Sequence, residues 1–319
     1  MRIPPFDDLA GKLLSLLPGF VDAGVRIPAD TDTGRITDFG PLALQFIREK
    51  LIDAGHVRKT VNDRIACIVK FFQWLSINEL CHVDIYRALD AVPGLEAGKT
   101  KAPDNPKVLP VSNDAVEATL PHLPPIVADM VRVQRLCGMR PQDVYNMRFC
   151  DIERTGDVWT YRPFTHKTEH FGKTLAKAIG PKAQTILTPY LFDKADSPEA
   201  FLFSPADTLR LQRAEKRARR KTRVQPSQVN RKKPTPKRTP KEQYTADSYR
   251  RAIERACDKA GVPRWAPNQL RHAAGTTTTA QFSLEAAKEF LGHASVKTTE
   301  QYYVAPLPEL AAKVAREIG

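Results

Sequence analysis

The stretch over residues 268–303 constrains this chain more than any other. It reads NQLRHAAGTTTTAQFSLEAAKEFLGHASVKTTEQYY and contains Arg271, a Leu-Gly-His sequence that ends at His293, and a tyrosine nine residues later, Tyr302. About 130 residues upstream of Arg271, the sequence Gly-Met-Arg-Pro-Gln-Asp supplies a second isolated arginine, Arg140, in an otherwise apolar setting. If both arginines act on one phosphate, the fold has to bring these two distant segments together.

These side chains are the groups needed for the attack of a phenol on a phosphodiester. A guanidinium offers paired N–H donors that match two phosphate oxygens, so two arginines neutralise a pentacoordinate phosphorus without a metal. A tyrosine has a pKa of about 10 and needs such a positive field to react. A histidine hydrogen-bonds the phosphate or assists the proton transfer.

With these motifs the sequence resembles the tyrosine recombinases, which include the phage integrases and the Xer-like DNA strand-exchange enzymes. The family pattern is G-x-R-x-x-[ED], a lysine on a β-hairpin, H-x-x-R-H, L-G-H and a tyrosine nine residues on. It matches the C-terminal two-thirds of the chain in order and spacing. The resemblance implies that the catalytic positions are Arg140, Lys167, Arg271, His293 and Tyr302.

One position departs from the family pattern. The first histidine of H-x-x-R-H is Asn268 in this chain. An asparagine amide donates a hydrogen bond to a phosphate oxygen, but it does not shuttle a proton near neutral pH. We therefore expect Asn268 to be a positioning group. His272 is interpreted as structural support for Arg271, and Asp143 as the group that orients Arg140.

Two of these assignments have close rivals. Lys167 lies at the tip of a hairpin predicted over residues 157–179, and Lys173 lies on the same small loop. We favour Lys167 as the residue that, in the family, protonates the departing 5′-oxygen. Of the tyrosine pair, the spacing from the Leu-Gly-His sequence favours Tyr302, and we expect Tyr303 to pack beside it.

The excess positive charge lies in one block. The chain has 49 Lys and Arg and 36 Asp and Glu, a net charge of +13, and residues 210–241 hold fourteen Lys or Arg against one acid, Glu215. A basic run of this kind is a solvated arm whose partner is a polyanion, and this one lacks the apolar face of a membrane-surface helix. We expect it to bind phosphates without reading the base sequence.

Composition also argues against several classes of protein and site. No span of 18 residues is apolar, and two aspartates and two prolines spoil the N-terminal segment as a signal peptide. The five cysteines are scattered without a C-x-x-C pair, so we expect a cytoplasmic protein with its cysteines in buried core positions. His166 and His170 have no Cys or acidic cluster to complete a zinc site, and we expect no metal and no cofactor.

Two domains are expected, in a mainly α fold with a small β-hairpin or sheet. Residues 38–52 and 59–77 have helical periodicity, the second with an apolar stripe that includes Trp74. They predict a helical bundle over residues 1–93, which the resemblance identifies as a core-binding domain that grips DNA.

The rest of the chain is expected to form the catalytic domain. Residues 93–110 contain four prolines and three lysines, which indicates an extended linker over residues 94–110. We expect a mixed α+β tyrosine-recombinase catalytic domain over residues 111–319, with the basic insertion at about 208–243 and a terminal amphipathic helix at 307–318.

The resemblance implies a metal- and ATP-independent site-specific recombinase or integrase. Tyr302 would attack a phosphate of double-stranded DNA and leave a 3′-phosphotyrosine, in a homo-tetramer held together through the C-terminal helix. Two alternatives stay open, a type IB topoisomerase that works as a monomer and a catalytically inactive DNA-binding relative. Asn268 lends the inactive relative some weight, whereas the spacing to the tyrosine and the trailing helix favour the recombinase.

Overall fold

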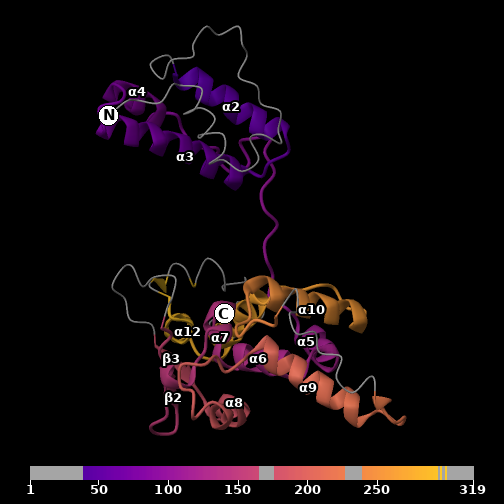
Figure 1. Ribbon diagram of the computed structural model, residues 1–319. Helices are drawn as coiled ribbons and strands as arrows, with labels where there is room; N and C mark the ends of the chain where they lie inside the picture. Colours follow the sequence, from indigo (N-terminus) through magenta and orange to yellow (C-terminus); the bar gives the residue numbers. More distant parts are fainter. Residues whose placement is uncertain (1–38, 165–175, 227–238, 294, 297–298, 300–319) are drawn as a thin grey trace, which may run out of the picture. The chain divides into compact units, whose positions relative to one another are not determined.

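The computed structural model describes residues 39–164, 176–226, 239–293, 295–296 and 299. The chain divides into two compact units, Met1–Lys107 and Val108–Gly319, whose elements are labelled in Figure 1. The division falls inside the segment over residues 94–110 that we expect to be a linker.

The described part of the first unit contains three helices, α2 (Pro41–Asp53), α3 (Arg58–Ile77) and α4 (Val83–Asp90). Their core consists of buried apolar side chains that recur at three- and four-residue spacing. These include Leu44, Leu51, Val61, Phe72, Leu75 and Leu89. A stripe of this kind drives amphipathic helices to pack on one another, so the two helices predicted at residues 38–52 and 59–77 are confirmed.

The apolar stripe of α3 is narrower than the sequence analysis predicts. Trp74, which we expect on the stripe, is 51% exposed. It follows the buried Phe72 by two residues, which is about 200° around the helix, so the two side chains point to opposite sides. The indole ring instead stacks on Phe71, with 6.2 Å between the ring centroids.

Part of the expected linker packs on α3. The side-chain amide of Asn62 accepts a hydrogen bond from the backbone N–H of Leu95 (2.8 Å) and donates one to its carbonyl (3.0 Å). Arg58 forms a salt bridge with Asp104 (2.6 Å) and also donates to the Leu95 carbonyl (3.2 Å). Residues 95–104 are therefore held against the helix, and the prolines in this segment do not make all of it an extended connection.

The second unit contains the remaining described elements. In chain order they are α5 (Asn113–Thr119), the 3-10 turn η2 (Leu120–His122), α6 (Pro125–Cys137), α7 (Pro141–Tyr145), the 3-10 turn η3 (Phe149–Asp151), β1 (Ile152–Glu153), β2 (Trp159–Tyr161), β3 (Lys177–Ile179), α8 (Pro181–Asp193), α9 (Pro205–Ala218), α10 (Ala246–Ala260), α11 (Asn268–Gln281) and α12 (Leu284–Leu291). The unit is mainly helical with one small sheet, as the sequence predicts.

The sheet has the strand order β1-β2-β3, and both neighbouring pairs are antiparallel. In the β2–β3 pair, Tyr161 lies opposite Lys177. This pair confirms the hairpin predicted over residues 157–179, although its described strands are shorter than predicted. The tip that carries Lys167 and Lys173 lies outside the described residues.

Helix α6 is largely buried in the second unit and packs against α7, α8, α11 and β3 (Figure 1). Most of its side chains are buried, while Asp129, Arg132 and Arg135 lie on its partly exposed side. The buried polar side chain of the helix is Gln134, whose amide donates to the Pro267 carbonyl (2.8 Å) and accepts a hydrogen bond from the hydroxyl of Tyr249 (2.9 Å). This side chain ties α6 to α10 and to the start of α11.

The cysteines do not all lie in the core. Cys137 and Cys257 are buried, whereas Cys81 is partly exposed and Cys67 and Cys150 are exposed. The expectation of five buried cysteines is therefore wrong, because Cys67 points away from the apolar stripe of α3 and Cys150 lies on the surface turn η3. Among the described helices, none has the length and apolar character needed to cross a membrane.

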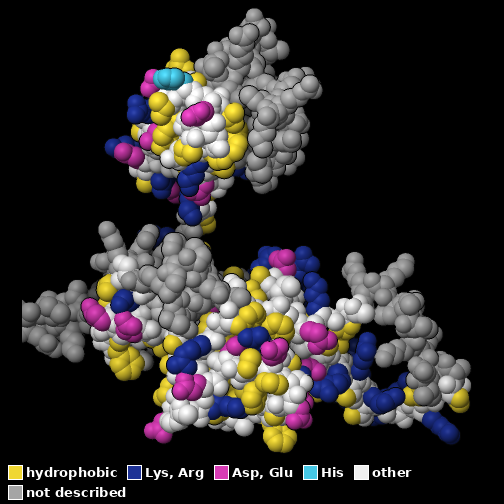
Figure 2. All heavy atoms as spheres, turned by 60° about the vertical axis from the view of Figure 1, so that its left-hand side comes forward, with side chains coloured by type: hydrophobic (Ala, Val, Ile, Leu, Met, Phe, Trp, Pro, Cys, Tyr) yellow, Lys and Arg dark blue, Asp and Glu magenta, His cyan; other side chains and the backbone are white. Residues whose placement is uncertain are grey.

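Charged side chains of both signs are scattered among hydrophobic ones on the face drawn in Figure 2, where Lys and Arg are dark blue and Asp and Glu are magenta. Several charged side chains of the second unit form salt bridges, such as Arg132 with Asp129 and Arg135 with Glu117, both at 2.7 Å. Exposed pairs of this kind contribute little to stability. They do leave fewer unpaired cations to bind an anionic partner.

Candidate active site

The first arginine of the motif follows a tight turn at the end of α6. Gly138 has a φ of +57°, and a Cβ atom at this position would lie 2.7 Å from Cε1 of Phe290. Both the backbone conformation and the close approach of this ring therefore require glycine. The turn leads directly to Arg140, which precedes α7 and is partly buried.

Asp143 fixes the backbone of Arg140. Its carboxylate accepts a hydrogen bond from the backbone N–H of Arg140 (3.1 Å), and the side chain is 2% exposed. The expected orienting role of Asp143 thus acts through the main chain at the start of α7. A hydrogen bond from the Tyr161 hydroxyl to the Asp143 carbonyl (2.8 Å) also ties this helix to β2.

The second arginine, Arg271, lies on α11 and is 3% exposed. Its Nη1 donates to the carbonyl of Gly138 (2.7 Å), and its Nη2 donates to the carbonyl of Leu291 (2.8 Å). The guanidinium is therefore held between the carboxyl end of α6 and the carboxyl end of α12. These two bonds fix the plane and direction of the guanidinium, whose N–H donors form a rigid fork.

The Leu-Gly-His sequence forms the end of α12. Gly292 adopts the left-handed conformation, with its N–H bonded to the carbonyl of Glu289 (3.0 Å), and the N–H of His293 bonds to the carbonyl of Lys288 (3.0 Å). This is the hydrogen-bond pattern of a Schellman motif, in which a glycine reverses the chain after a helix. The turn places His293 immediately beyond the helix end.

Four positive or polarised groups surround the ring of His293. Burial, as the largest cause, and the charges of Arg271, Arg140 and Lys177, with a contribution from His272, together lower the pKa of His293 to about 4. The imidazole is therefore neutral at neutral pH, and its Nδ1 shares a hydrogen bond with the hydroxyl of Thr299 (2.9 Å). A neutral ring is able to donate one hydrogen bond to a phosphate oxygen.

Asn268 and His272 lie one turn apart on α11. The Asn268 side chain is exposed, and its amide nitrogen is 3.1 Å from Nε2 of His272. His272 is buried, and burial together with the charge of Arg271 lowers its pKa. The contact links Asn268 to the residue beside Arg271, which agrees with the supporting role that we expect of His272.

The structure brings together four of the six expected site residues, Arg140, Asn268, Arg271 and His293, the asparagine through its contact with His272. Lys167 and Tyr302 lie outside the described residues, as do their rivals Lys173 and Tyr303 and the two hairpin histidines. Within the part of the chain that the structure describes, no group of three or more His, Cys, Asp or Glu side chains is placed to hold a metal.

The sequence analysis missed one residue of this cluster, Lys177. It is the first residue of β3, is 1% exposed, and donates from Nζ to the carbonyls of Leu291 and, at 3.4 Å, of Phe290. A signal was present, because Lys177 is two residues before the apolar Ile179. In a strand, residues at this spacing share a face, so the alternation of this strand could have indicated a lysine on the buried side.

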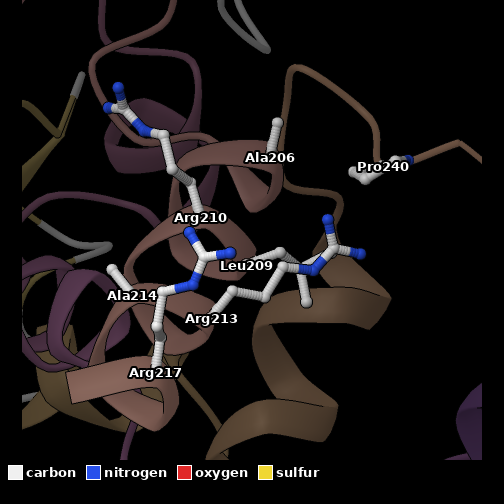
Figure 3. A pocket seen from close by; sticks show the side chains of 7 residues that line it. All are labelled: Ala206, Leu209, Arg210, Arg213, Ala214, Arg217 and Pro240. Atoms are coloured by element: carbon white, nitrogen blue, oxygen red, sulfur yellow. The ribbon is translucent and has the colours of Figure 1, made fainter. Parts of the chain in front are cut away.

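A second arginine cluster lies on α9 and lines a groove with Pro240 (Figure 3). Arg210, Arg213 and Arg217 recur at three- and four-residue spacing, so they share one side of the helix. Arg210 is paired with Asp207 (3.1 Å). Among the described residues, Arg213 and Arg217 form no salt bridge, and Arg213 extends towards Pro240 in Figure 3.

With this geometry established, comparisons with known proteins identify the family. The profile described as the phage integrase family matches residues 125–309, which is more than half of the chain. No curated protein matches the chain in sequence.

Several solved structures have a similar fold. The Tn1549 transposon integrase in complex with transposon right end DNA is 13% identical, with 99% of this chain and 95% of that chain covered and a TM-score of 0.62. The XerH site-specific recombinase bound to a palindromic difH substrate is 16% identical, with 88% of this chain and 73% of that chain covered and a TM-score of 0.58. A lambda integrase dimer bound to a COC′ core site is 13% identical, with 96% of this chain and 97% of that chain covered and a TM-score of 0.56.

At such low identity these likenesses show the fold alone, whereas the family profile spans the motifs that contain Arg140, Arg271 and His293. The chain belongs to the phage integrase family and is a tyrosine-type site-specific DNA recombinase.

Proposed function

We propose that this protein cuts and rejoins double-stranded DNA through a 3′-phosphotyrosine intermediate. The Oη of Tyr302 loses its proton to solvent as it attacks the phosphorus, the bond from phosphorus to the 5′-oxygen breaks, and Lys167 gives a proton to the departing oxygen. The new phosphotyrosine bond conserves the energy of the phosphodiester, so the strands rejoin without ATP. The reverse attack by a 5′-hydroxyl restores the DNA and the free tyrosine.

The position of Arg271 is the observation that carries this proposal. Two backbone carbonyls hold its guanidinium, and the charges of Arg271 and Arg140 both act on His293. Donors fixed before the reaction stabilise developing negative charge without reorganisation. We assign Arg140 and Arg271 to the non-bridging phosphate oxygens, with His293 as a further donor and Asn268 as a positioning group.

We propose that the partner of this site is duplex DNA and that the active assembly is a homo-tetramer. The similar Tn1549, XerH and lambda structures are complexes with DNA, which supports the first part. The helix expected at residues 307–318 would join neighbouring protomers, and the unit Met1–Lys107 would contact the DNA as a core-binding domain.

We further propose that the arginines of α9 bind DNA phosphates outside the reaction site. Arg213 and Arg217 are on the same side of a solvated helix within the basic block over residues 210–241. Exposed arginines on flexible side chains add affinity and salt dependence without choosing bases.

The decisive experiment is a covalent-adduct assay on a duplex with a nick near the scissile phosphate, which traps the cleaved state. The native protein should form a covalent protein–DNA adduct. Tyr302→Phe should abolish the adduct and leave DNA binding nearly intact, because it removes one oxygen from an otherwise unchanged ring. Tyr303→Phe is the matched control and should keep the adduct. An adduct that survives Tyr302→Phe and disappears in Tyr303→Phe would overturn the assignment.

Lys167 is tested by changing the leaving group. Lys167→Ala should slow cleavage severely on an ordinary phosphate and much less on a 5′-bridging phosphorothiolate, since a thiolate leaves without a proton. Lys173→Ala is the matched control. A similar loss on both substrates would remove Lys167 from the proton-donor role.

The two open alternatives are separated by plasmid assays. A recombinase exchanges strands only when two target sites are present, whereas a type IB topoisomerase relaxes supercoiled DNA that lacks paired sites. Absence of any adduct with the native protein, combined with tight DNA binding, would instead identify a catalytically inactive relative.

A further inference from the structure

A buried lysine lies beside the arginines. Lys177 begins β3, is 1% exposed, and points to the same side of the strand as the fully buried Ile179. Lysine is almost never fully buried in a protein unless its ammonium group has partners, because removing the charge from water is costly. The contacts of its Nζ atom therefore indicate what holds the side chain there.

Those contacts are the last carbonyls of α12. The final four carbonyls of a helix lack partners within the helix. The turn at Gly292 satisfies the carbonyls of Lys288 and Glu289, and the described backbone donors of the turn do not reach those of Phe290 and Leu291. Nζ of Lys177 donates to both remaining carbonyls. A cation at the carboxyl end of a helix is also favoured by the helix dipole.

Lys177 shares one of these acceptors with the second motif arginine. The Leu291 carbonyl accepts from Nζ of Lys177 and from Nη2 of Arg271. A carbonyl oxygen has two lone pairs, so both bonds can form. Loss of the lysine would remove one donor from each of the Phe290 and Leu291 carbonyls and would loosen the helix end to which Arg271 is bonded.

Opposing charges set the state of this lysine. The pKa of Lys177 is lowered to about 7, chiefly by burial and also by the charges of Arg271 and Arg140, while Asp143 and Cys137 act in the opposite direction. Tyr161 faces it across the β2–β3 pair. Either protonation state keeps N–H donors for the two carbonyls.

We infer that Lys177 is a positioning residue of the reaction, which fixes the end of α12 and thereby the places of Arg271 and His293. This inference rests on the proposed function. The residue acts through backbone carbonyls and does not itself contact the phosphate. Its place on β3 also links the base of the hairpin that carries Lys167 to the turn that carries His293.

The test compares Lys177→Met, which keeps the length of the side chain and removes its donors, with Lys177→Arg, which keeps the donors. Lys259→Met, on the exposed end of α10, is the matched control. Adduct formation is measured in single turnovers on saturating DNA, with both the phosphate and the phosphorothiolate substrate. Thermal melting of each full-length variant checks that it is folded.

Lys177→Met should slow cleavage about 100-fold, because misplacing reacting groups by about 1 Å costs that much. The loss should be equal on both substrates, DNA affinity should change little, and Lys177→Arg should recover part of the rate. Rescue of Lys177→Met by the phosphorothiolate would make the residue a proton donor and would overturn the inference. A native rate in a folded Lys177→Met would overturn it equally.

A second measurement does not depend on catalysis. In the free protein, Lys177→Met removes one of the charges that face His293, the others being Arg271, Arg140 and His272. The pKa of His293, followed by NMR of its ring protons, should rise, whereas Lys259→Met should leave it unchanged. An unshifted pKa would show that Lys177 does not lie at this site. Failure of the native protein to form an adduct, with the shift present, would overturn the proposed function and leave the placement of Lys177 standing.

Discussion

The two arginine clusters of the second unit have the same charge and opposite surroundings. Arg271 is 3% exposed and is held by the carbonyls of Gly138 and Leu291. Arg213 and Arg217 lie in an open groove on α9, where they form no salt bridge to the described residues. Fixed donors are suited to a transition state, because they need not be ordered when charge develops. Mobile donors are suited to affinity.

The number of arginines in a cluster therefore does not decide what each of them does. The basic block over residues 210–241 has many more cations than the buried cluster. Its arginines should nevertheless contribute less to the rate, since each loses side-chain entropy when it binds and is screened by salt. The same substitution made in both clusters therefore tests whether burial and backbone contacts decide the role.

The largest effect is expected for Arg271→Lys. A lysine has one charged nitrogen, so it cannot bind the carbonyls of Gly138 and Leu291 and also bind a phosphate. Adduct formation in single turnovers should fall by about 100- to 1,000-fold, the loss typical of one missing oxyanion donor. The same exchange on α9, Arg213→Lys, is the matched control and should leave the rate unchanged. Equal rates for the two variants would show that burial and backbone contacts do not distinguish Arg271 from Arg213.

Gly138→Ala should have the next largest effect, which is a loss of stability. The new Cβ atom would lie 2.7 Å from Phe290 and 3.0 Å from Leu291, on a backbone with φ of +57°. Urea unfolding should show a loss of about 2–4 kcal/mol, the strain of the left-handed backbone added to overpacking. Gly261→Ala is the matched control, because Gly261 also ends a helix with positive φ (+68°) but has no atom within 4 Å. It should cost only about 1–2 kcal/mol. Similar losses would show that the site is not tightly packed.

The buried cluster should also make stability depend on pH. Its positive charges and its burial hold the pKa of His293 at about 4, below its ordinary value of 6.5. The unfolded chain therefore takes up a proton at a higher pH than the folded protein, so this stabilisation is present above pH 6.5 and is lost as the pH falls towards 4.

His293→Gln removes this titration. Between pH 7 and pH 4.5 the variant should lose about 1–2 kcal/mol less stability than the native protein, in urea melts at a series of pH values, because water partly screens the half-buried ring. Parallel curves for the two proteins would mean that the ring of His293 is solvated, and the contrast with α9 would be weaker.

The smallest effect is expected for Arg213→Ala combined with Arg217→Ala. At low salt and saturating DNA the rate of adduct formation should be native. The log–log dependence of affinity on salt should flatten by at most about 1.8, since each phosphate contact contributes about 0.9. Arg219→Ala, which removes an arginine already paired with Glu215 (2.6 Å), is the matched control. A loss confined to the target sequence would show that α9 reads bases.

Much of the helical framework could be predicted because its sequence signals are local. Helix α3 lies within one residue of the range expected from apolar spacing, and α2 lies within three. The cap of α5 is a local signal of the same kind, because Ser112 Oγ accepts from the N–H of Ala115 (3.3 Å). The motif order also identified Arg140, Arg271 and His293 as neighbours before any coordinates.

The remainder depended on tertiary contacts. Helix α7 has five residues and α4 has eight, too few for periodicity to stand out. The folding of residues 95–104 onto α3 rests on the side chains of Asn62 and Arg58, and no local pattern predicts these contacts. The role of Lys177 depends on carbonyls more than 110 residues away in sequence, and backbone acceptors have no sequence signature.

The two backbone carbonyls that hold Arg271, those of Gly138 and Leu291, have a consequence for evolution and for design. Main-chain oxygens belong to every residue, so the side chain at position 291 can change without removing the acceptor. What cannot change is the path of the chain, which depends on glycine at 138 and on the left-handed Gly292. Moving this site to another scaffold would therefore require the carboxyl ends of two helices, equivalent to α6 and α12, at the same distance and orientation as in this protein. A graft of the arginine, the histidine and the tyrosine alone would transfer the reacting side chains without the backbone that positions them.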